Sequence, residues 1–286
     1  MKTTISMKKI RTVLVGLGSV NLGVLRILAE KKQIILKNHG LEYIIVAVAD
    51  SSGIAINNKG YSYEQLVKLK SCHQKVSCLT GYLPQVSVEK ITEHINADML
   101  IDGSPVNLQT GSPGFQVIQK ALSKGWNVVS ANKSPLVLGF DTLHELANKH
   151  GGQIAYSAGV CGGLPVINVL QRDLLATELI SLSGIFNATS NFILEELEND
   201  QSFDSAVAEA KRIGAAEADP SLDIDGYDTA NKLFIIMKSF SNFSGSIKNI
   251  AIEGIRDITA KAIKEASNRG NRIKLLAEAK KNQGVW

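Results

Sequence analysis

The sequence has few of the residues from which disulfide frameworks, metal centres and nucleophilic triads are built. Its three cysteines are an odd number without regular spacing, so we expect reduced thiols in a cytoplasmic protein and no zinc site. The five histidines do not cluster with Cys, Asp or Glu at ligand spacing. No Ser-His-Asp arrangement and no P-loop is visible, so acyl transfer and phosphoryl transfer have no support.

Long apolar runs, a targeting segment and a strong net charge are also missing. The longest apolar runs, such as residues 44–49, are far too short to cross a bilayer, and the charged first residues lead straight into a strand. We therefore expect no membrane partner and no signal peptide. The formal net charge of +4 is small, and acidic residues interrupt the basic ones late in the chain. This pattern favours a solvated helix surface and no nucleic-acid partner.

The chain does have the length and apolar content for two domains. It holds 286 residues, of which 44% are hydrophobic. We place a dinucleotide-binding domain at residues 1–150 and a substrate-binding, catalytic and dimerisation domain at residues 151–286. In the first half, strands alternate with helices, which predicts an α/β fold with a Rossmann-type, doubly wound parallel sheet. The predicted strands are 11–15, 43–49, 97–102, 126–130 and 153–156, and the predicted helices are 22–28, 115–124 and 141–150.

A glycine turn, G-L-G-S-V-N at residues 16–21, follows the first strand and opens a helix. This is the context that a dinucleotide-binding turn requires, and we expect its backbone amides to hold a pyrophosphate. The predicted cofactor-binding residues are Gly16, Gly18, Ser19 and Val20. Asn21 occupies the position of the third glycine, so we expect the helix to lie slightly further from its strand. The alternative is a purely structural strand-to-helix turn.

Asp50 ends the second predicted strand. A carboxylate there can accept hydrogen bonds from the adenosine ribose and would repel a 2′-phosphate, which favours NAD over NADP. A nearby cation such as Lys59 would weaken that preference. Ser104 and Lys133 follow later strands, where the ligands of such a sheet bind, and we predict both as cofactor-binding residues.

The second half lacks the regular alternation of strands and helices. A strand is predicted at 180–187, and helices are predicted at 166–175, 203–213 and 230–240. This order indicates an α+β domain with an exposed sheet face, which a second subunit commonly covers. We therefore expect a homodimer.

An acid-rich segment, residues 215–233, carries five carboxylates within a dozen positions. Such a run is usually a solvated loop, and a capped, solvated helix start remains the alternative here. However, Asp228 and Lys232 lie four residues apart where a helix begins, so their side chains share one face. The preceding loop would hold Glu217 and Asp223 around that face, which suits a small substrate that bears an ammonium group.

These residues also carry a resemblance. The run E-A-D-P-S-L-D-I-D-G-Y-D-T-A-N-K at 217–232 resembles the signature of homoserine dehydrogenases, and V-V-S-A-N-K-S-P-L at 128–136 resembles the second signature of that family. The resemblance implies that Glu217 and Asp223 bind the amino-acid substrate. It also implies that Asp228 and Lys232 act at the reacting alcohol, and that Lys133 is a second catalytic lysine.

A third match, G-I-F-N-A-T-S-N-F-I at 184–193, fits the G-I-x-N-x-T-x-N-x-I pattern of the family. The resemblance implies that Asn187 and Thr189 face the substrate. The alternative is that both side chains satisfy hydrogen bonds of a turn.

The glycine-rich run S-A-G-V-C-G-G-L-P at 157–165 resembles the turn in which that family holds a monovalent cation. The carbonyl positions match Val160, Gly162 and Leu164. The family's acidic ligand is replaced by Ser157, and the loss of an anionic ligand weakens a site for a hard cation.

The resemblance implies reversible hydride transfer between L-homoserine and NAD or NADP, giving L-aspartate 4-semialdehyde, in the pathway to threonine, methionine and isoleucine. It also implies several tens of residues beyond Leu276, whereas this sequence ends at Trp286. We therefore expect a short, monofunctional form that is either truncated at its C-terminus or leaves its dinucleotide half partly uncovered, and in the second case cofactor affinity would suffer first. Two alternatives stay open: a catalytically impaired NAD-binding homologue, and a dehydrogenase of this fold that acts on another amino acid.

Overall fold

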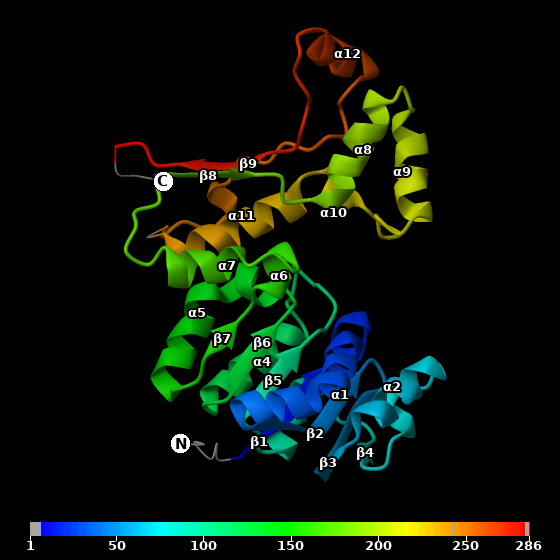
Figure 1. Ribbon diagram of the computed structural model, residues 1–286, viewed down its shortest axis with the longest axis vertical. Helices are drawn as coiled ribbons and strands as arrows, with labels where there is room; N and C mark the ends of the chain where they lie inside the picture. Colours follow the sequence, from blue (N-terminus) through cyan, green and yellow to red (C-terminus); the bar gives the residue numbers. More distant parts are fainter. Residues whose placement is uncertain (1–6, 242, 284–285) are drawn as a thin grey trace. The chain divides into compact units, whose positions relative to one another are not determined.

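The computed structural model describes residues 7–241, 243–283 and 286 (Figure 1). The chain divides into two compact units, of which the first ends at Gly163 and the second begins at Leu164. The sequence placed this division after residue 150. The structure keeps β7 (Ile154–Ala155) in the first unit, because β7 pairs in parallel with β6 (Asn127–Ser130).

Among the described residues, the first unit contains a seven-stranded sheet in the order β4-β3-β2-β1-β5-β6-β7. The pairs β2–β1, β1–β5, β5–β6 and β6–β7 are parallel. At the other edge, β3 pairs antiparallel with β2, and β4 pairs antiparallel with β3. The strand order changes direction at β1, which creates a ligand-binding switch point beside the ends of β1 and β5. The predicted Rossmann-type α/β class is confirmed. The other strands are β1 (Lys8–Val15), β2 (Leu41–Asp50), β3 (Gly53–Tyr61), β4 (Tyr82–Leu83) and β5 (Met99–Asp102).

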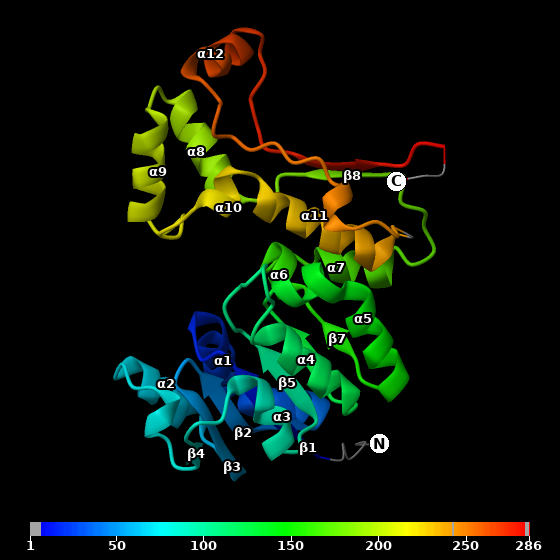
Figure 2. The same cartoon turned by 180° about the vertical axis from the view of Figure 1, so that it is seen from behind.

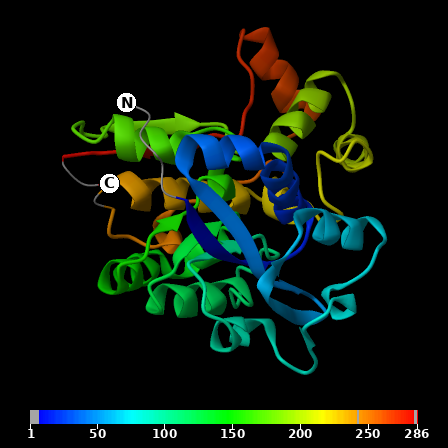
Figure 3. The same ribbon diagram turned by 60° about the horizontal axis from the view of Figure 1, so that its bottom comes forward.

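Helices cover both faces of this sheet, as Figures 2 and 3 show from two further sides. One face packs against α1 (Ser19–His39) and α2 (Tyr63–Ser71), and Leu25 and Leu66 are fully buried there. The burial of each such leucine contributes about 1.5–3 kcal/mol. The other face packs against three helices: α3 (Ile91–His94), α4 (Gly114–Ser123) and α5 (Ser134–His150).

The polar stretch 55–80, which the sequence left unassigned, contains most of β3 and all of α2. Ser62 caps α2 by accepting a hydrogen bond from the Gln65 amide at 3.0 Å. Polar residues form regular structure here because β3 pairs with β2, while one side of α2 packs on the core.

In the second unit, β8 (Ser181–Gly184) pairs antiparallel with β9 (Ala277–Lys280), and α11 (Tyr227–Phe240) lies along this ribbon (Figures 1 and 2). Leu233 and Met237 of α11 pack against Ala277 of β9. Four further helices of this unit pack around a second core. These are α8 (Ala188–Glu198), α9 (Phe203–Arg212), α10 (Ser221–Ile224) and α12 (Ala260–Asn268). The arrangement is α+β, as predicted.

One predicted helix, residues 166–175, has a different form. A short α7 (Val166–Asn168) continues into a π-helical turn, η3 (Val169–Asp173). Leu175, which was predicted to end the helix, is 77% exposed and adds no buried apolar contact there.

Within the part of the chain that the structure describes, no helix combines the length and apolarity needed to cross a membrane.

Candidate active site

The glycine turn closes the end of β1 against the end of β5. Gly16 has a φ of +79°, and a Cβ on it would lie 2.4 Å from the carbonyl oxygen of Gly103. The Gly103 amide donates to the carbonyl of Val15 at 2.8 Å, which fixes this close approach. Because both the conformation and the space exclude a side chain, position 16 requires glycine.

The N-terminus of α1, which follows this turn, is open. Gly18 is the N-cap residue; no side chain caps the helix, and its first turn carries no acidic residue. A Cβ on Gly18 would meet nothing within 4 Å. The first amides of a helix have no partner within the helix and lie at its positive end, so this end suits a phosphate group. Gly16, Gly18, Ser19 and Val20, the predicted cofactor-binding residues, form this turn and the uncapped start of α1.

Asn21 replaces the third glycine of the turn, and it is fully buried. Its Nδ2 donates to the carbonyl oxygens of Gly16 at 2.7 Å and Val15 at 3.1 Å. A Cβ on Gly103 would lie 3.1 Å from the Asn21 amide. Hydrogen bonds thus hold α1 to the turn where the usual glycine would allow close packing.

Asp50, at the end of β2, is held by four hydrogen bonds. Its Oδ1 accepts from the amide and hydroxyl of Ser52 at 2.8 and 2.6 Å. Its Oδ2 accepts from Lys70 Nζ at 2.5 Å and from the amide of Val76 at 3.1 Å. Burial acts to raise the pKa of Asp50, but these donors together lower it below its ordinary value. The cation beside Asp50 is therefore Lys70, whereas the sequence had suggested Lys59.

A buried polar network joins the ends of β5 and β6. Asp102, which is 1% exposed, accepts from the Ser104 amide at 3.0 Å and from the Ser130 hydroxyl at 3.1 Å. Asn132 Nδ2 donates to the Ser104 hydroxyl at 3.1 Å. Lys133 follows Asn132 directly, so its backbone is fixed by this network. Burial raises the pKa of the Asp102 carboxyl group.

In the second unit, two carboxylates of the acid-rich segment bind specific partners. Asp219 accepts from the amide and hydroxyl of Ser221 at 3.1 and 2.6 Å. Asp225 binds Arg256 through both carboxylate oxygens, at 2.8 and 3.1 Å. These contacts tie Asp219 and Asp225 to specific partners, while Glu217 and Asp219 stay exposed to solvent.

Asp228 and Lys232 form the ion pair that their spacing predicted. Lys232 Nζ lies 2.8 Å from Asp228 Oδ2, and the two side chains are 17% and 8% exposed. Lys232 Nζ also donates to the carbonyl of Phe186 at 2.6 Å. The ammonium group is thus held by a charged and a neutral acceptor, largely shielded from solvent, which suits a group that exchanges a proton with a substrate hydroxyl.

Asn187 and Thr189 make the internal hydrogen bonds that the sequence left open as an alternative. Asn187 Nδ2 donates to Asp223 Oδ1 at 2.5 Å and to Asp228 Oδ2 at 2.9 Å. The Thr189 hydroxyl donates to the carbonyl of Ala215 at 2.6 Å, so it anchors the start of the acid-rich segment. The remaining predicted residue, Glu217, is exposed and takes no part in this cluster.

The glycine-rich run that resembles a cation-binding turn, with Ser157 in place of the acidic ligand, spans the division between the units. Val160 and Gly162 belong to the first unit, and Leu164 is the first residue of the second. Among the described residues, no group of three or more His, Cys, Asp and Glu side chains is arranged to hold a metal ion.

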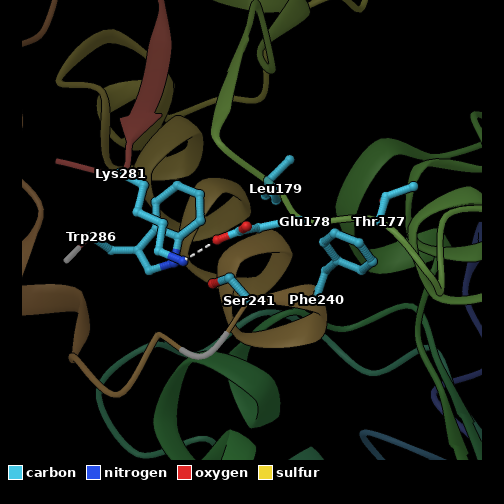
Figure 4. Close-up of a pocket in the computed structure, with 7 residues that line it drawn as sticks. All are labelled: Thr177, Glu178, Leu179, Phe240, Ser241, Lys281 and Trp286. Atoms are coloured by element: carbon cyan, nitrogen blue, oxygen red, sulfur yellow. Dashed lines mark hydrogen bonds and ion pairs between the residues drawn. The ribbon is translucent and has the colours of Figure 1, made fainter. Parts of the chain in front are cut away.

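A separate cavity of about 380 Å³ lies in the second unit (Figure 4). Lys281 and Glu178 line it and form an ion pair at 2.6 Å, so their charges are directed at one another. None of its described lining residues is a predicted site residue. Its lining is completed by Thr177, Leu179, Phe240, Ser241 and Trp286.

Together, a Rossmann-type unit with an open helix N-terminus and an α+β unit with a shielded lysine–carboxylate pair define a two-domain protein of the dinucleotide-dependent dehydrogenase class. A family model for homoserine dehydrogenase matches residues 165–285. The homoserine dehydrogenase of Methanocaldococcus jannaschii is 35% identical over 269 residues, which cover 94% of this chain and 80% of that protein. The chain belongs to the homoserine dehydrogenase family.

Two further comparisons agree with this assignment. The NAD(+)-dependent homoserine dehydrogenase of Pseudomonas canavaninivorans is 29% identical over 277 residues, which cover 96% of this chain and 79% of that protein. A solved hyperthermophilic archaeal homoserine dehydrogenase in complex with NADPH has a TM-score of 0.79 at 26% identity, and the match covers 96% of this chain and 79% of that chain.

Proposed function

We propose that this protein interconverts L-homoserine and L-aspartate 4-semialdehyde with NAD or NADP, as a step of threonine, methionine and isoleucine synthesis. The observation that carries the proposal is the shielded pair of Lys232 and Asp228 at 2.8 Å, with Asp223 beside it through Asn187. Membership of the homoserine dehydrogenase family supports the substrate and the reaction.

The residues of the glycine turn fit a dinucleotide. The uncapped amides at the start of α1 would bind its pyrophosphate, and the empty space beside Gly18 allows a close approach of the backbone. Ser104 and Lys133 would lie toward the nicotinamide half, because they follow the strands beside the switch point. When bound, the nicotinamide accepts or supplies the hydride.

The protein's own part in the reaction is to orient the substrate and to move one proton. Loss of a hydride from the alcohol carbon requires that the hydroxyl proton leaves as well. Lys232, held by Asp228, and Lys133 are the proposed proton acceptors and donors. Asp223 and Glu217 would attract the substrate's ammonium group, since both are carboxylates of the same segment.

We propose that NAD is preferred over NADP. The support is Asp50, whose lowered pKa keeps it ionised at neutral pH, so its charge opposes a 2′-phosphate. Lys70 neutralises part of that charge at 2.5 Å, so the preference is moderate. One relative is named NAD(+)-dependent and one related structure contains NADPH, in keeping with a family that uses both cofactors.

We further propose a cytoplasmic homodimer. Ile180, Ile185 and Leu276 flank the two-stranded ribbon and are 67%, 46% and 58% exposed. A two-stranded ribbon is marginal by itself, and a second copy would cover these side chains. Analytical ultracentrifugation at several protein concentrations tests this assembly.

A monovalent cation at Val160, Gly162 and Leu164 fits less well, since Ser157 offers no negative charge, and we assign it no step in the reaction.

The function is tested by following reduced nicotinamide absorbance with homoserine and NAD, with homoserine and NADP, and with a panel of other hydroxy amino acids. We expect turnover with homoserine, at a higher kcat/KM for NAD. Turnover with a different amino acid alone would assign another substrate. Cofactor binding without turnover on any substrate would identify a catalytically impaired homologue.

A further inference from the structure

The side chain of Asn187 has no hydrogen-bond donor left for a substrate. Asn187 is 5% exposed and is the N-cap residue of α8, where its Oδ1 accepts from the Ser190 amide at 2.7 Å. Its Nδ2 carries two hydrogens, and these are directed at Asp223 and Asp228. The orientation of the amide is fixed by chemistry, because only the oxygen can accept from Ser190 and only the nitrogen can donate to carboxylates.

The two carboxylates that Asn187 joins belong to different helices. Asp223 lies on α10 and Asp228 on α11, and both approach the same nitrogen atom, at 2.5 and 2.9 Å. The ammonium group of Lys232 lies 2.8 Å from Asp228 Oδ2. Like charges this close repel one another, more strongly where water is excluded. The amide supplies one donor to each carboxylate without adding charge.

The residue type at position 187 follows from these two tasks. Ser, Thr, Asp and Asn all cap helices well. Among them, only asparagine combines an acceptor for the cap with two donors on a second atom. Serine or threonine would leave at least one carboxylate without its donor. Aspartate would cap α8 equally well but would place a third negative charge against Asp223 and Asp228.

We propose that Asn187 is a positioning residue for the reaction, which holds the Asp223 and Asp228 carboxylates together and so fixes the place of the Lys232 ammonium group. Asp228 Oδ2 accepts from both Asn187 and Lys232, at 2.9 and 2.8 Å, so displacement of this oxygen moves the ammonium group. The inference rests on the proposed role of Lys232 in catalysis. It replaces direct substrate contact as the role of Asn187.

The test compares the variant Asn187→Asp with the unchanged protein. Aspartate keeps the cap on α8, but the two donors are lost and a negative charge is added against Asp223 and Asp228, so the melting temperature should fall, and kinetics are measured well below it. We expect kcat to fall about 10- to 100-fold, as for other small displacements of a reacting group. The pH of maximum turnover should rise, because a third carboxylate favours the ammonium form of Lys232. The KM for NAD should not change.

Ser202→Ala is the matched control, because Ser202 caps α9 in the same unit by accepting from Ser205 at 3.2 Å and contacts no carboxylate pair. It should lower stability and leave kcat and the pH profile unchanged. An Asn187→Asp variant with unchanged kcat and pH profile would overturn the proposal. A rise in the KM for homoserine at unchanged kcat would also overturn it, because that result describes a substrate contact.

A second measurement separates this inference from the proposed reaction. NMR titration of ¹³C-methylated lysines reports the ionisation of Lys232, whose signal is identified by its loss in Lys232→Ala. The Lys232 titration should move to higher pH in Asn187→Asp whether or not homoserine is turned over. If the unchanged protein has no turnover, the proposed function fails, and the titration still decides whether Asn187 controls Lys232. An unshifted titration would contradict the role of Asn187.

Discussion

One half of the candidate site is formed mainly by backbone atoms, and the other half is formed by side chains. The half proposed to bind the dinucleotide is made of backbone: a positive φ at Gly16, open space at Gly18 and a start of α1 that no side chain caps. The half that carries Lys232 is made of side chains, whose charges are set by pairing. The first half therefore depends on the absence of a Cβ, and the second depends on which polar atoms meet. Substitutions should reveal this difference.

The largest expected effect is a contrast between two glycines of one turn. Gly16→Ala introduces a Cβ that would lie 2.4 Å from a backbone oxygen at a φ of +79°, so we expect destabilisation of more than about 4 kcal/mol. Gly18→Ala meets nothing within 4 Å, so stability should stay within about 0.5 kcal/mol while NAD affinity falls. Urea unfolding and NAD titration measure both. Equal destabilisation by the two substitutions would show that the turn is not built as described.

The next contrast concerns the lysine beside Asp50. Lys70→Met removes the cation that lies 2.5 Å from this carboxylate, so we expect the preference for NAD over NADP to rise by roughly tenfold. Lys59→Met is the matched control, because Lys59 is exposed on β3 and should leave the preference unchanged. The measurement is the ratio of kcat/KM for the two cofactors. A larger effect of Lys59→Met would return the role to the lysine that the sequence suggested.

A smaller effect is expected for the exposed acid of the substrate segment. Glu217→Gln should raise the KM for homoserine by about fivefold or less, since an exposed charge contributes at most about 1 kcal/mol. The kcat should not change, because Glu217 lies outside the cluster around Lys232. Glu195→Gln, an exposed acid on α8, serves as the control. If kcat falls instead of KM rising, Glu217 acts at the reacting atoms.

The smallest effect is on stability and comes from Asp102, whose pKa is raised by burial. A carboxyl group with a raised native pKa stabilises the fold below its unfolded pKa, and this contribution is lost as pH rises through the native pKa. Asp102→Asn is neutral at every pH and keeps the acceptor for Ser104. The variant should therefore gain stability relative to the parent between about pH 4 and about pH 7. Free energies of unfolding at the two pH values test this sign, and a loss over that interval would contradict it.

Patterns that are local in the chain predicted much of the fold. The strand–turn–helix at residues 11–28 and the strands that end at Asp102 and Ser130 were placed correctly, because runs buried on both faces are apolar throughout. The segment 55–80 was left unassigned, since its polar residues take their structure from pairing with β2. The helix predicted at 166–175 is helical over 166–173, but periodicity did not reveal that it turns π-helical at Val169.

For the candidate site too, contacts between residues close in the chain were predictable, and contacts between distant residues were not. The Asp228–Lys232 pair was predictable, because a spacing of four residues brings two side chains together on any helix. The contacts of Asn187 join residues 36 and 41 positions apart, and Lys70 is 20 positions from Asp50. No periodicity specifies such distances. Only the resemblance pointed to Asn187, and it gave the residue a different role.

The central claim is that the held ammonium group of Lys232 performs the proton transfer of a homoserine dehydrogenase. The direct measurement is the turnover of homoserine with NAD by Lys232→Ala, beside NAD binding by the same variant. Lys261→Ala is the control, since Lys261 is 86% exposed on α12. Turnover of Lys232→Ala should fall by about 10² to 10⁴, while its NAD affinity and the activity of the control stay unchanged. Unchanged turnover in Lys232→Ala would contradict this claim.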